Sequence, residues 1–368
     1  MKQQAGSIQR NAWRRLRKNK GAVAGMFVIA IACLLALTAY FVAPDHSPYA
    51  NRMIVEIGGR RPGYTQSFLL LPRSKTVEAT SFWSRMLFGS EDAYTHIPIN
   101  AYQPGKDSLV VTQYIDESVE ERMVYPMSLL RGNAPGQNDP YRIEKKTFWL
   151  GTDKYGRDIL SRLLIGVRIS LSVGLITVVI SLSIGVLLGS LAGYYGGKTD
   201  NVIMWLTNVI WSIPTLLLVF AITLLMGKGF WQVFVAIGLT MWVNVARIVR
   251  GQVLGVRELE YVEASRALGF SNRRIILRHI LPNIMGPVLV VAASNFASAI
   301  VIEAGLSFLG VGVQPPQPSW GLMIKENYNF IITHNPALAL APGVAIMLLV
   351  LAFNLLGNGL RDALNVRG

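Results

Sequence analysis

Charged residues are scarce in this chain. Only 15% of its 368 residues are Asp, Glu, Lys or Arg, whereas a soluble domain carries roughly a quarter. Hydrophobic residues make up 52%. They gather in runs long enough to cross the hydrocarbon core of a bilayer, which takes about 20 mostly apolar residues. The composition argues against an ordinary soluble enzyme and predicts an all-α polytopic membrane protein.

Six apolar runs are candidate spans. The first is expected to be a retained helix, because it is longer than the core of a signal peptide and no small-x-small cleavage site follows it cleanly. We therefore predict six transmembrane helices. The runs are Gly21 to Ala43, Ile169 to Ala192, Val202 to Met226, Phe230 to Ala246, Ile284 to Ala304 and Ala337 to Leu356.

Cysteine and histidine are almost missing. The single Cys33 makes no intrachain disulfide and no cysteine-based metal site. No two of the four histidines have the spacing of metal ligands on a helix, so no metal site is expected. The segment 192–199 fits a relaxed phosphate-loop pattern, but membrane spans flank it where such a loop needs a strand and a helix. We expect a tight inner turn there, no ATP binding and no catalysis by this chain.

Acidic residues are almost absent from the spans. An ion-coupled carrier usually places acids within its helices, and here only Glu303, near the outer end of the fifth span, qualifies. Glu303 is a candidate for the substrate path. It is equally compatible with an interfacial residue bonded to the outer loop. Pro214 and Pro287 are expected to kink or open the third and fifth spans.

Basic residues are concentrated on one predicted side of the membrane. Residues 1–43 contain seven Lys or Arg and no acid, so the N-terminus is expected in the cytoplasm. Counting spans places residues 247–282 inside as well, and there seven arginines face three glutamates. The net charge of +14 is therefore interpreted as determining the membrane topology. No nucleic-acid partner is expected. The segment 8–20 is either an interfacial helix or a plain basic tail.

A long polar segment, 44–167, separates the first two spans. Its acids and bases nearly balance, and long loops cross a membrane largely regardless of charge. A structureless loop of this length would be unusual. We therefore expect a small extracytoplasmic domain, with strands around Ser108 to Tyr114.

The cytoplasmic loop 247–282 has a helical pattern in two parts. The first helix is expected over 258–268, and Gly269 follows where a left-handed residue closes a helix. Ser271 is expected to cap a second helix over 272–281. Pro282 is expected to mark the boundary with the fifth span. The loop thus predicts two short helices bent at Gly269 and projecting from the membrane.

The same loop resembles the EAA signature of permease subunits of ABC importers. The resemblance rests on Glu263-Ala264-Ser265, Gly269 and Leu281-Pro282; Ser265 stands for the second alanine, and His279 stands where the consensus has isoleucine. Four further stretches resemble the C-type subunit of the dipeptide, oligopeptide and nickel branch (oligopeptide permease C-like). They are Leu150 to Asp158, Gly193 to Gly197, Glu303 to Gly312 and Pro315 to Gly321.

This resemblance implies a type I ABC importer permease core (MetI-like) with a long extracytoplasmic insertion between helices 1 and 2. The implied organisation is a basic cytoplasmic segment (1–20), helix 1 (21–43), the extracytoplasmic segment (44–167), a five-helix core (168–360) with the coupling loop 247–282, and a cytoplasmic tail (361–368). Both termini would lie on the cytoplasmic side of a bacterial inner membrane.

The resemblance also implies partners. They are a sister permease in a heterodimer, two cytoplasmic ATPases that bind ATP and Mg²⁺, and an extracytoplasmic substrate-binding protein. This chain itself would carry no cofactor. Glu263 would fix the coupling helix by hydrogen bonds, Ala264 and Ser265 would permit close approach, and Gly269 would hold the bend. The cargo stays open among peptides, nickel chelates and peptide-like antibiotics. An ion-coupled secondary transporter, a channel subunit and a membrane-embedded enzyme are the alternatives.

Overall fold

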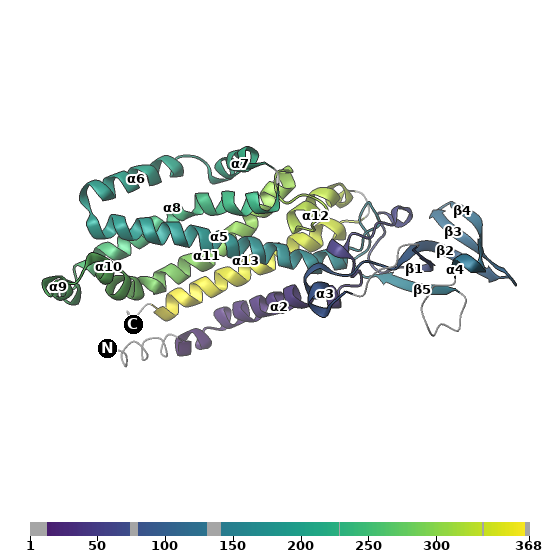
Figure 1. The fold of residues 1–368 in the computed structure, drawn as a ribbon, viewed down its shortest axis with the longest axis horizontal. Coiled ribbons are helices and arrows are strands. Elements are labelled where there is room, and N and C mark those ends of the chain that lie inside the picture. The colour runs from purple at the N-terminus through teal and green to yellow at the C-terminus, as the bar shows by residue number, and fades with distance from the viewer. Residues whose placement is uncertain (1–12, 74–79, 131–140, 228, 333–334, 365–368) are drawn as a thin grey trace. The chain divides into compact units, whose positions relative to one another are not determined.

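The structure is a computed structural model that describes residues 13–73, 80–130, 141–227, 229–332 and 335–364 (Figure 1). The chain divides into two compact units, which are described separately below. The first comprises residues 1–33, 170–314 and 345–368. The second comprises residues 34–169 and 315–344. Three helices, α2, α5 and α13, continue from one unit into the other.

Long apolar helices build the first unit. Among the described residues, five helices are long and apolar enough to cross a membrane, or six if a bent pair counts as one span. This agrees with the sequence prediction of several membrane helices. The five are α2 (Lys20–Val42), α5 (Ile159–Tyr195), α8 (Phe230–Arg257), α11 (Leu281–Leu309, continuous with residues from Asn272) and α13 (Ala337–Leu364).

Small residues let these helices approach closely. On α5, Gly185, Gly189 and Gly193 recur every four residues and face α8. A Cβ atom at Gly189 would lie 2.5 Å from the carbonyl oxygen of Ala246. Association of membrane helices relies on such small-residue faces, because lipid gives no hydrophobic drive between helices. This row therefore fixes α5 against α8, and α8 packs in turn along α11 (Figure 1).

The third predicted span is broken. The stretch contains α6 (Gly197–Trp211) and α7 (Thr215–Met226), which are bent by 90° between Trp211 and Thr215. Pro214 lies at the break and is the N-cap residue of α7. Because proline lacks a backbone N–H and clashes with the preceding turn, it cannot continue α6. The kink expected at Pro214 is therefore present, whereas α11 runs through Pro287 as one helix.

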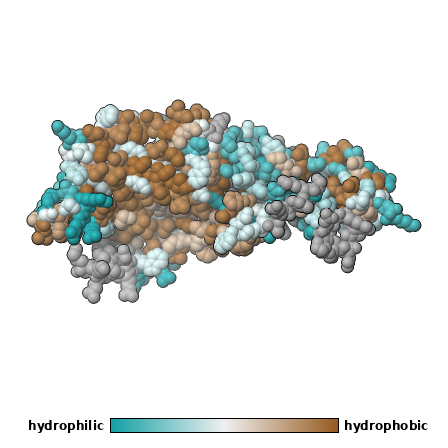
Figure 2. Space-filling view, viewed as in Figure 1, coloured by the Kyte–Doolittle hydropathy of each residue, from teal (hydrophilic) through white to brown (hydrophobic). Residues whose placement is uncertain are grey.

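The outer surface of the helical unit is strongly apolar. Figure 2 shows broad hydrophobic areas over the helices. Large side chains such as Phe27, Leu217 and Leu225 are more than half exposed. Exposing such a surface to water would cost free energy, whereas contact with lipid tails carries no such cost. The arrangement fits helices embedded in a bilayer.

A five-stranded antiparallel sheet forms most of the second unit, in the order β4-β3-β2-β1-β5. The expectation of an all-α chain is therefore wrong for this segment. The predicted strand around Ser108 to Tyr114 is present as β3. The strands are β1 (Tyr64–Pro72), β2 (Tyr94–Pro104), β3 (Ser108–Asp116), β4 (Val119–Pro126) and β5 (Arg142–Phe148).

Each face of the sheet has its own apolar core. Phe68 and Leu70 pack with Ile57, Tyr114 and Phe148, while Leu69 packs on the other face with Ile99, Leu109 and Val111. Successive side chains of a strand point to opposite faces, so the run Phe68-Leu69-Leu70 feeds both cores. Short elements complete the unit: η1 (Pro48–Ala50), η2 (Val55–Ile57), α3 (Phe82–Phe88), α4 (Met127–Leu130), α12 (Trp320–Asn327) and η4 (Tyr328–Ile331).

Candidate functional site

The predicted coupling loop contains two helices bent at Gly269. Helix α9 spans Glu260–Ala267, and α10 spans Asn272–Ile275. Ser271 occupies the N-cap position of α10, but its side chain makes no capping hydrogen bond. A π-helical turn, η3 (Ile276–Ile280), joins α10 to α11. Helix α11 begins at Leu281, and Pro282 lies in its first turn, where proline is tolerated. The boundary expected at Pro282 is therefore present to within one residue, although the chain stays helical across it.

The bend at Gly269 has a defined backbone geometry. Gly269 has φ +76°, a left-handed conformation that costs other L-residues roughly 1–2 kcal/mol. Its N–H bonds to the carbonyl of Arg266, and the N–H of Phe270 bonds to the carbonyl of Ser265 at 3.2 Å. These bonds satisfy carbonyls that the end of α9 would leave without a partner. The left-handed cap predicted at Gly269 is confirmed.

An apolar core holds α9 in place. Val262, Ile275 and Ile280 are fully buried together with Val253 of α8 and Ile284 of α11. Side-chain contacts add to this core. The hydroxyl of Tyr194 donates to Oδ1 of Asn272 at 2.8 Å, and Nδ2 of Asn283 donates to the Tyr261 hydroxyl at 2.8 Å. The loop is therefore packed onto the transmembrane helices α8 and α11, so a force on α9 reaches them directly.

The outer face of α9 is open. Glu263 and Ala264 are exposed, and Leu268 beside the bend is 73% exposed. In the described part of the chain, no hydrogen bond or ion pair is formed by the Glu263 carboxylate. Ser265 is buried, and its hydroxyl donates to the carbonyl of Tyr261 at 2.7 Å. Of the predicted coupling residues, Glu263 and Ala264 therefore face outward, and Ser265 faces the core. The prediction that Glu263 fixes this helix by hydrogen bonds is wrong for the described part of the chain, because its carboxylate points away from the helix core.

The remaining predicted site residues lie on α11. Leu281 packs against the loop core, while Pro282 is exposed. Glu303 is buried, and its Oε1 accepts a hydrogen bond of 2.6 Å from the Ser307 hydroxyl. That hydroxyl in turn accepts the N–H of Val313 at 3.0 Å. Glu303 thus secures the turn after α11, and its role in a substrate path stays a prediction.

The glycine-rich segment 192–199 joins two helices. Helix α5 ends at Tyr195 and α6 begins at Gly197. A phosphate-binding loop needs a preceding strand, and none is present here. Nη1 of Arg257 donates to the carbonyl of Gly193 at 2.8 Å. This segment is a tight turn, as the sequence predicted.

A buried charge cluster joins the motif Leu150 to Asp158 to helix α12, and sequence reasoning missed it. Arg157, from the segment Leu150 to Asp158, donates to Oδ2 of Asp153 at 2.6 Å and to Oε2 of Glu326 at 2.7 Å. Arg162 is fully buried, with Nε 3.9 Å from the same Asp153 oxygen and Nη2 3.7 Å from Oε2 of Glu326. The cluster fixes α12 to the start of α5.

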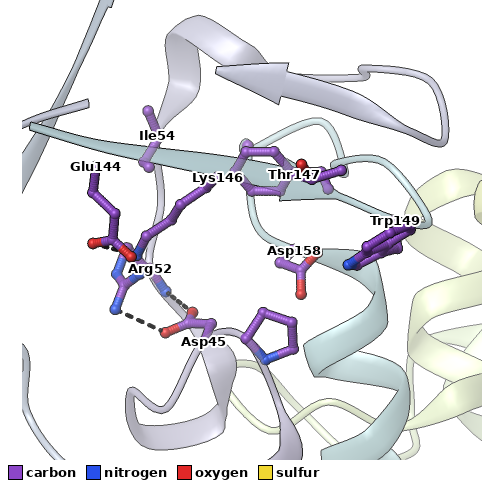
Figure 3. A pocket seen from close by; sticks show the side chains of 11 residues that line it. Asp45, Arg52, Ile54, Glu144, Lys146, Thr147, Trp149 and Asp158 are labelled. Atoms are coloured by element: carbon purple, nitrogen blue, oxygen red, sulfur yellow. Dashed lines mark hydrogen bonds and ion pairs between the residues drawn. The ribbon is translucent and has the colours of Figure 1, made fainter. Parts of the chain in front are cut away.

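A cavity of about 260 Å³ lies at one end of β5, in the second unit (Figure 3). Charged side chains gather on one side of it. Asp45 pairs with Arg52 at 3.3 Å, and Lys146 lies 3.8 Å from Glu144. Burial raises the pKa of Asp158, and burial together with Arg52 lowers the pKa of Lys146. The Asp45–Arg52 pair lies within the segment after α2, and the Lys146–Glu144 pair lies within β5.

His96 is expected to make this unit sensitive to acid. Burial, followed by Arg52 and Lys146, lowers its pKa to about 3. Nζ of Lys146 lies 3.0 Å from Nε2 of His96 and donates a hydrogen bond to it. This contact requires a neutral ring in which Nε2 carries no proton. Because the folded pKa lies below the unfolded value of about 6.5, the stabilisation is complete above pH 6.5 and is lost as the pH falls toward 3.

We expect His96→Gln to flatten this pH dependence. Between pH 7 and 5, hydrogen exchange of β1 and β2 amides, corrected for intrinsic rates, should accelerate more in the native chain than in His96→Gln. His46→Gln serves as the control. Equal acceleration in the native chain and in His96→Gln would show that His96 does not carry this sensitivity.

Comparisons with known proteins agree with this geometry. The family model for the binding-protein-dependent transport system inner membrane component matches residues 185–367. A model for the N-terminal transmembrane domain of oligopeptide transport permease C matches residues 7–54.

Individual relatives match over longer stretches. The dipeptide transport system permease protein DppC of Lactococcus lactis is 34% identical, over 98% of this chain and 91% of that protein. DppC of Bacillus subtilis is 37% identical over 81% of this chain and 92% of its own length. The glutathione transport system permease protein GsiD of Pectobacterium atrosepticum is 44% identical over 59% of this chain and 72% of its own length.

Proposed function

Because this chain belongs to the family of binding-protein-dependent transport system inner membrane components, a family of ABC importer permeases, we propose that it is the C-type permease of an importer for dipeptides or oligopeptides. It would form the translocation path in a heterodimer with a sister permease. Two ATPases would bind ATP and Mg²⁺ on the cytoplasmic side. A substrate-binding protein would deliver cargo from outside. The peptide cargo is supported by the dipeptide and oligopeptide relatives.

The coupling loop is the observation that carries the proposal. Its outer face presents an unpaired carboxylate, a small residue and an exposed apolar side chain: Glu263, Ala264 and Leu268. Its inner face is packed on α8 and α11. A docked ATPase would therefore move the transmembrane helices when ATP binding closes the ATPase pair. The chain needs no catalytic residue of its own for this role.

The charge pattern supports an orientation for this assembly. The coupling loop carries exposed arginines near α10, among them Arg273, Arg274 and Arg278. Basic loops stay in the cytoplasm, which is the side where the ATPases work. Both termini would then also be cytoplasmic, and the sheet would face the outside, where the binding protein arrives.

Leu268→Asp is expected to weaken ATPase association by roughly tenfold or more, because truncating a buried interface anchor typically costs about 2 kcal/mol or more. The complex is expressed from its native operon, solubilised gently and purified through a tag on this chain. The amounts of retained ATPase and sister permease are then measured. Leu129→Asp is the matched control, since Leu129 is an exposed leucine in the sheet unit.

Two results would contradict the proposal. If the native chain purifies alone or as a homo-oligomer under mild conditions, it is not an importer subunit, and assays for an ion-coupled carrier or a channel come next. If ATPases are retained equally by Leu268→Asp and by the control, the contact does not involve the outer face of α9.

A further inference from the structure

A second cavity lies within the helical unit. It has a volume of about 200 Å³. This is below the roughly 300 Å³ or more of pockets that enclose whole drug-sized ligands, so it suits one segment of an extended cargo. Five of its nine lining side chains are uncharged polar groups: Thr215, Thr240, Asn244, Asn295 and Ser298; Trp211, Met241, Val243 and Ile302 supply the apolar remainder.

The cavity lies near the midpoints of three membrane-spanning segments. Asn244 lies near the centre of α8, and Asn295 lies near the centre of α11. The break between α6 and α7 brings Trp211 and Thr215 to the same place. The N-terminus of α7 has no side-chain cap. Interrupted helices are tolerated at membrane depth only where they are buried in protein or line a water-filled space.

Polar side chains at this depth need polar surroundings. Asn244 and Ser298 are exposed on the surface of this chain, although α8 and α11 are long and apolar enough to cross a membrane. An amide facing lipid tails would lose its hydrogen bonds to water without replacement. Asn295 is buried, and its Nδ2 lies 3.5 Å from the Ser181 hydroxyl. Asn244 and Ser298 therefore face an aqueous path, and the buried Asn295 lies beneath them in the cavity wall.

The charge around the cavity limits what it accepts. None of its lining side chains carries a charge. One turn beyond Asn244, Arg247 stacks over the Trp211 ring at 3.5 Å and donates to Oδ1 of Asn208 at 2.6 Å. The positive charge of the Arg247 guanidinium lies close to the cavity, and no acidic side chain lines the cavity. Binding of a free divalent cation is therefore disfavoured. Neutral amides or a carboxylate of the cargo are compatible with the electrostatic potential in the cavity.

We propose that this cavity is a peptide-backbone binding point in the translocation path, where the Asn244, Thr240 and Ser298 side chains exchange hydrogen bonds with backbone amides of the cargo. The inference rests on the proposed function and adds the chemistry of recognition. Side-chain amides and hydroxyls both donate and accept hydrogen bonds. They therefore match a peptide bond whatever side chains the cargo carries. Selection among sequences is left to other parts of the complex.

Cysteine labelling tests the location directly. In a Cys33→Ser background of the full complex in proteoliposomes, Asn244→Cys and Ser298→Cys are treated with the water-soluble thiol reagent MTSET, and the mass of this subunit is measured. We expect both variants to be modified, because a thiolate in contact with water attacks the sulfenyl sulfur of the reagent, forms a mixed disulfide and releases methanesulfinate. Phe27→Cys in the same background, and Cys33 in the native chain, both exposed on apolar α2, are expected to stay unmodified. Failure of both Asn244→Cys and Ser298→Cys to react would overturn the inference.

Peptide protection tests the ligand. With the binding protein and ATP present, tri-alanine should slow modification of the Asn244→Cys variant several-fold, whereas NiCl₂ should not. Asn244→Leu should reduce tri-alanine uptake roughly fivefold, as expected for one lost hydrogen bond, with ATP hydrolysis retained. Ser298→Val is a second, smaller change in case Asn244→Leu fails to assemble. Phe27→Leu is the matched control.

The outcomes separate the two levels of the proposal. Normal tri-alanine uptake, with no protection of the thiol in Asn244→Cys, refutes the cavity as a peptide site and leaves the importer intact. Failure of the native complex to import any peptide, with ATPases bound, refutes the peptide cargo and this inference together. Protection by NiCl₂ but not by tri-alanine would also refute the cavity as a peptide site.

Discussion

Gly269→Val should reduce ATP-driven uptake by roughly tenfold or more, because a left-handed conformation costs an L-residue about 1–2 kcal/mol and a β-branched one more. Gly269 has φ +76°, and a Cβ atom there would meet nothing within 4 Å. The penalty is therefore one of backbone conformation and not of steric clash. Valine should straighten or shift the end of α9 and misplace Glu263 and Leu268. Basal ATP hydrolysis should continue without transport.

The matched control is Gly269→Asn. Asparagine tolerates the left-handed region far better than valine does, so uptake should stay close to that of the native chain. Uptake and ATP hydrolysis are measured together in proteoliposomes, and the ratio of the two reports coupling. If Gly269→Val transports with the native ratio of uptake to ATP hydrolysis, this bend is not required for coupling.

Glu326→Gln should destabilise the second unit by roughly 3 kcal/mol, the scale measured when one partner of a buried ion pair is removed. The native cluster balances two arginines against Asp153 and Glu326. Neutralising Glu326 leaves Arg157 and the fully buried Arg162 with one carboxylate. The expected result is a melting temperature several degrees lower and weaker incorporation into the complex.

The double variant Glu326→Gln/Arg162→Met is the control that isolates charge. It restores one arginine to one carboxylate, and Arg162 contributes no hydrogen bond from its guanidinium in the described structure. The double variant should therefore melt above Glu326→Gln alone. If it melts lower, Arg162 stabilises the unit by packing, and charge balance is not what holds α12.

Features that depend on neighbouring residues were predictable from the sequence. Apolar runs locate the membrane helices, because about 20 such residues satisfy both span length and lipid contact. Gly269 was identifiable because a glycine after a helical pattern has few other roles. The proline break was also expected at Pro214. Its 90° bend was not, since the angle depends on packing that a single sequence does not display.

Features that depend on distant residues were missed. Arg157 and Glu326 are separated by 169 positions, so no local pattern connects them. Apart from the strand predicted around Ser108 to Tyr114, the sheet was missed for a related reason. Exposed edge strands such as β4, with the sequence VEERMVYP, lack the alternation that marks a half-buried strand. Only β3 was predicted, and its sequence SLVVTQYID is rich in β-branched residues, which favour strands. Asn244 and Asn295 were hidden within apolar runs that suggested nothing beyond a span.

The strand order of the sheet has a consequence for how this chain can be engineered. The first and last strands, β1 and β5, are neighbours, with Tyr64 opposite Phe148. The N–H of Gly63 bonds to the carbonyl of Phe148 at 2.9 Å. The polypeptide therefore enters and leaves the sheet at neighbouring points, and the residues between them form an insertion that is closed at its base. Such a module can be shortened, exchanged or tagged while Gly63 and Trp149 keep their separation, which makes it a natural place to graft a reporter or a foreign recognition domain.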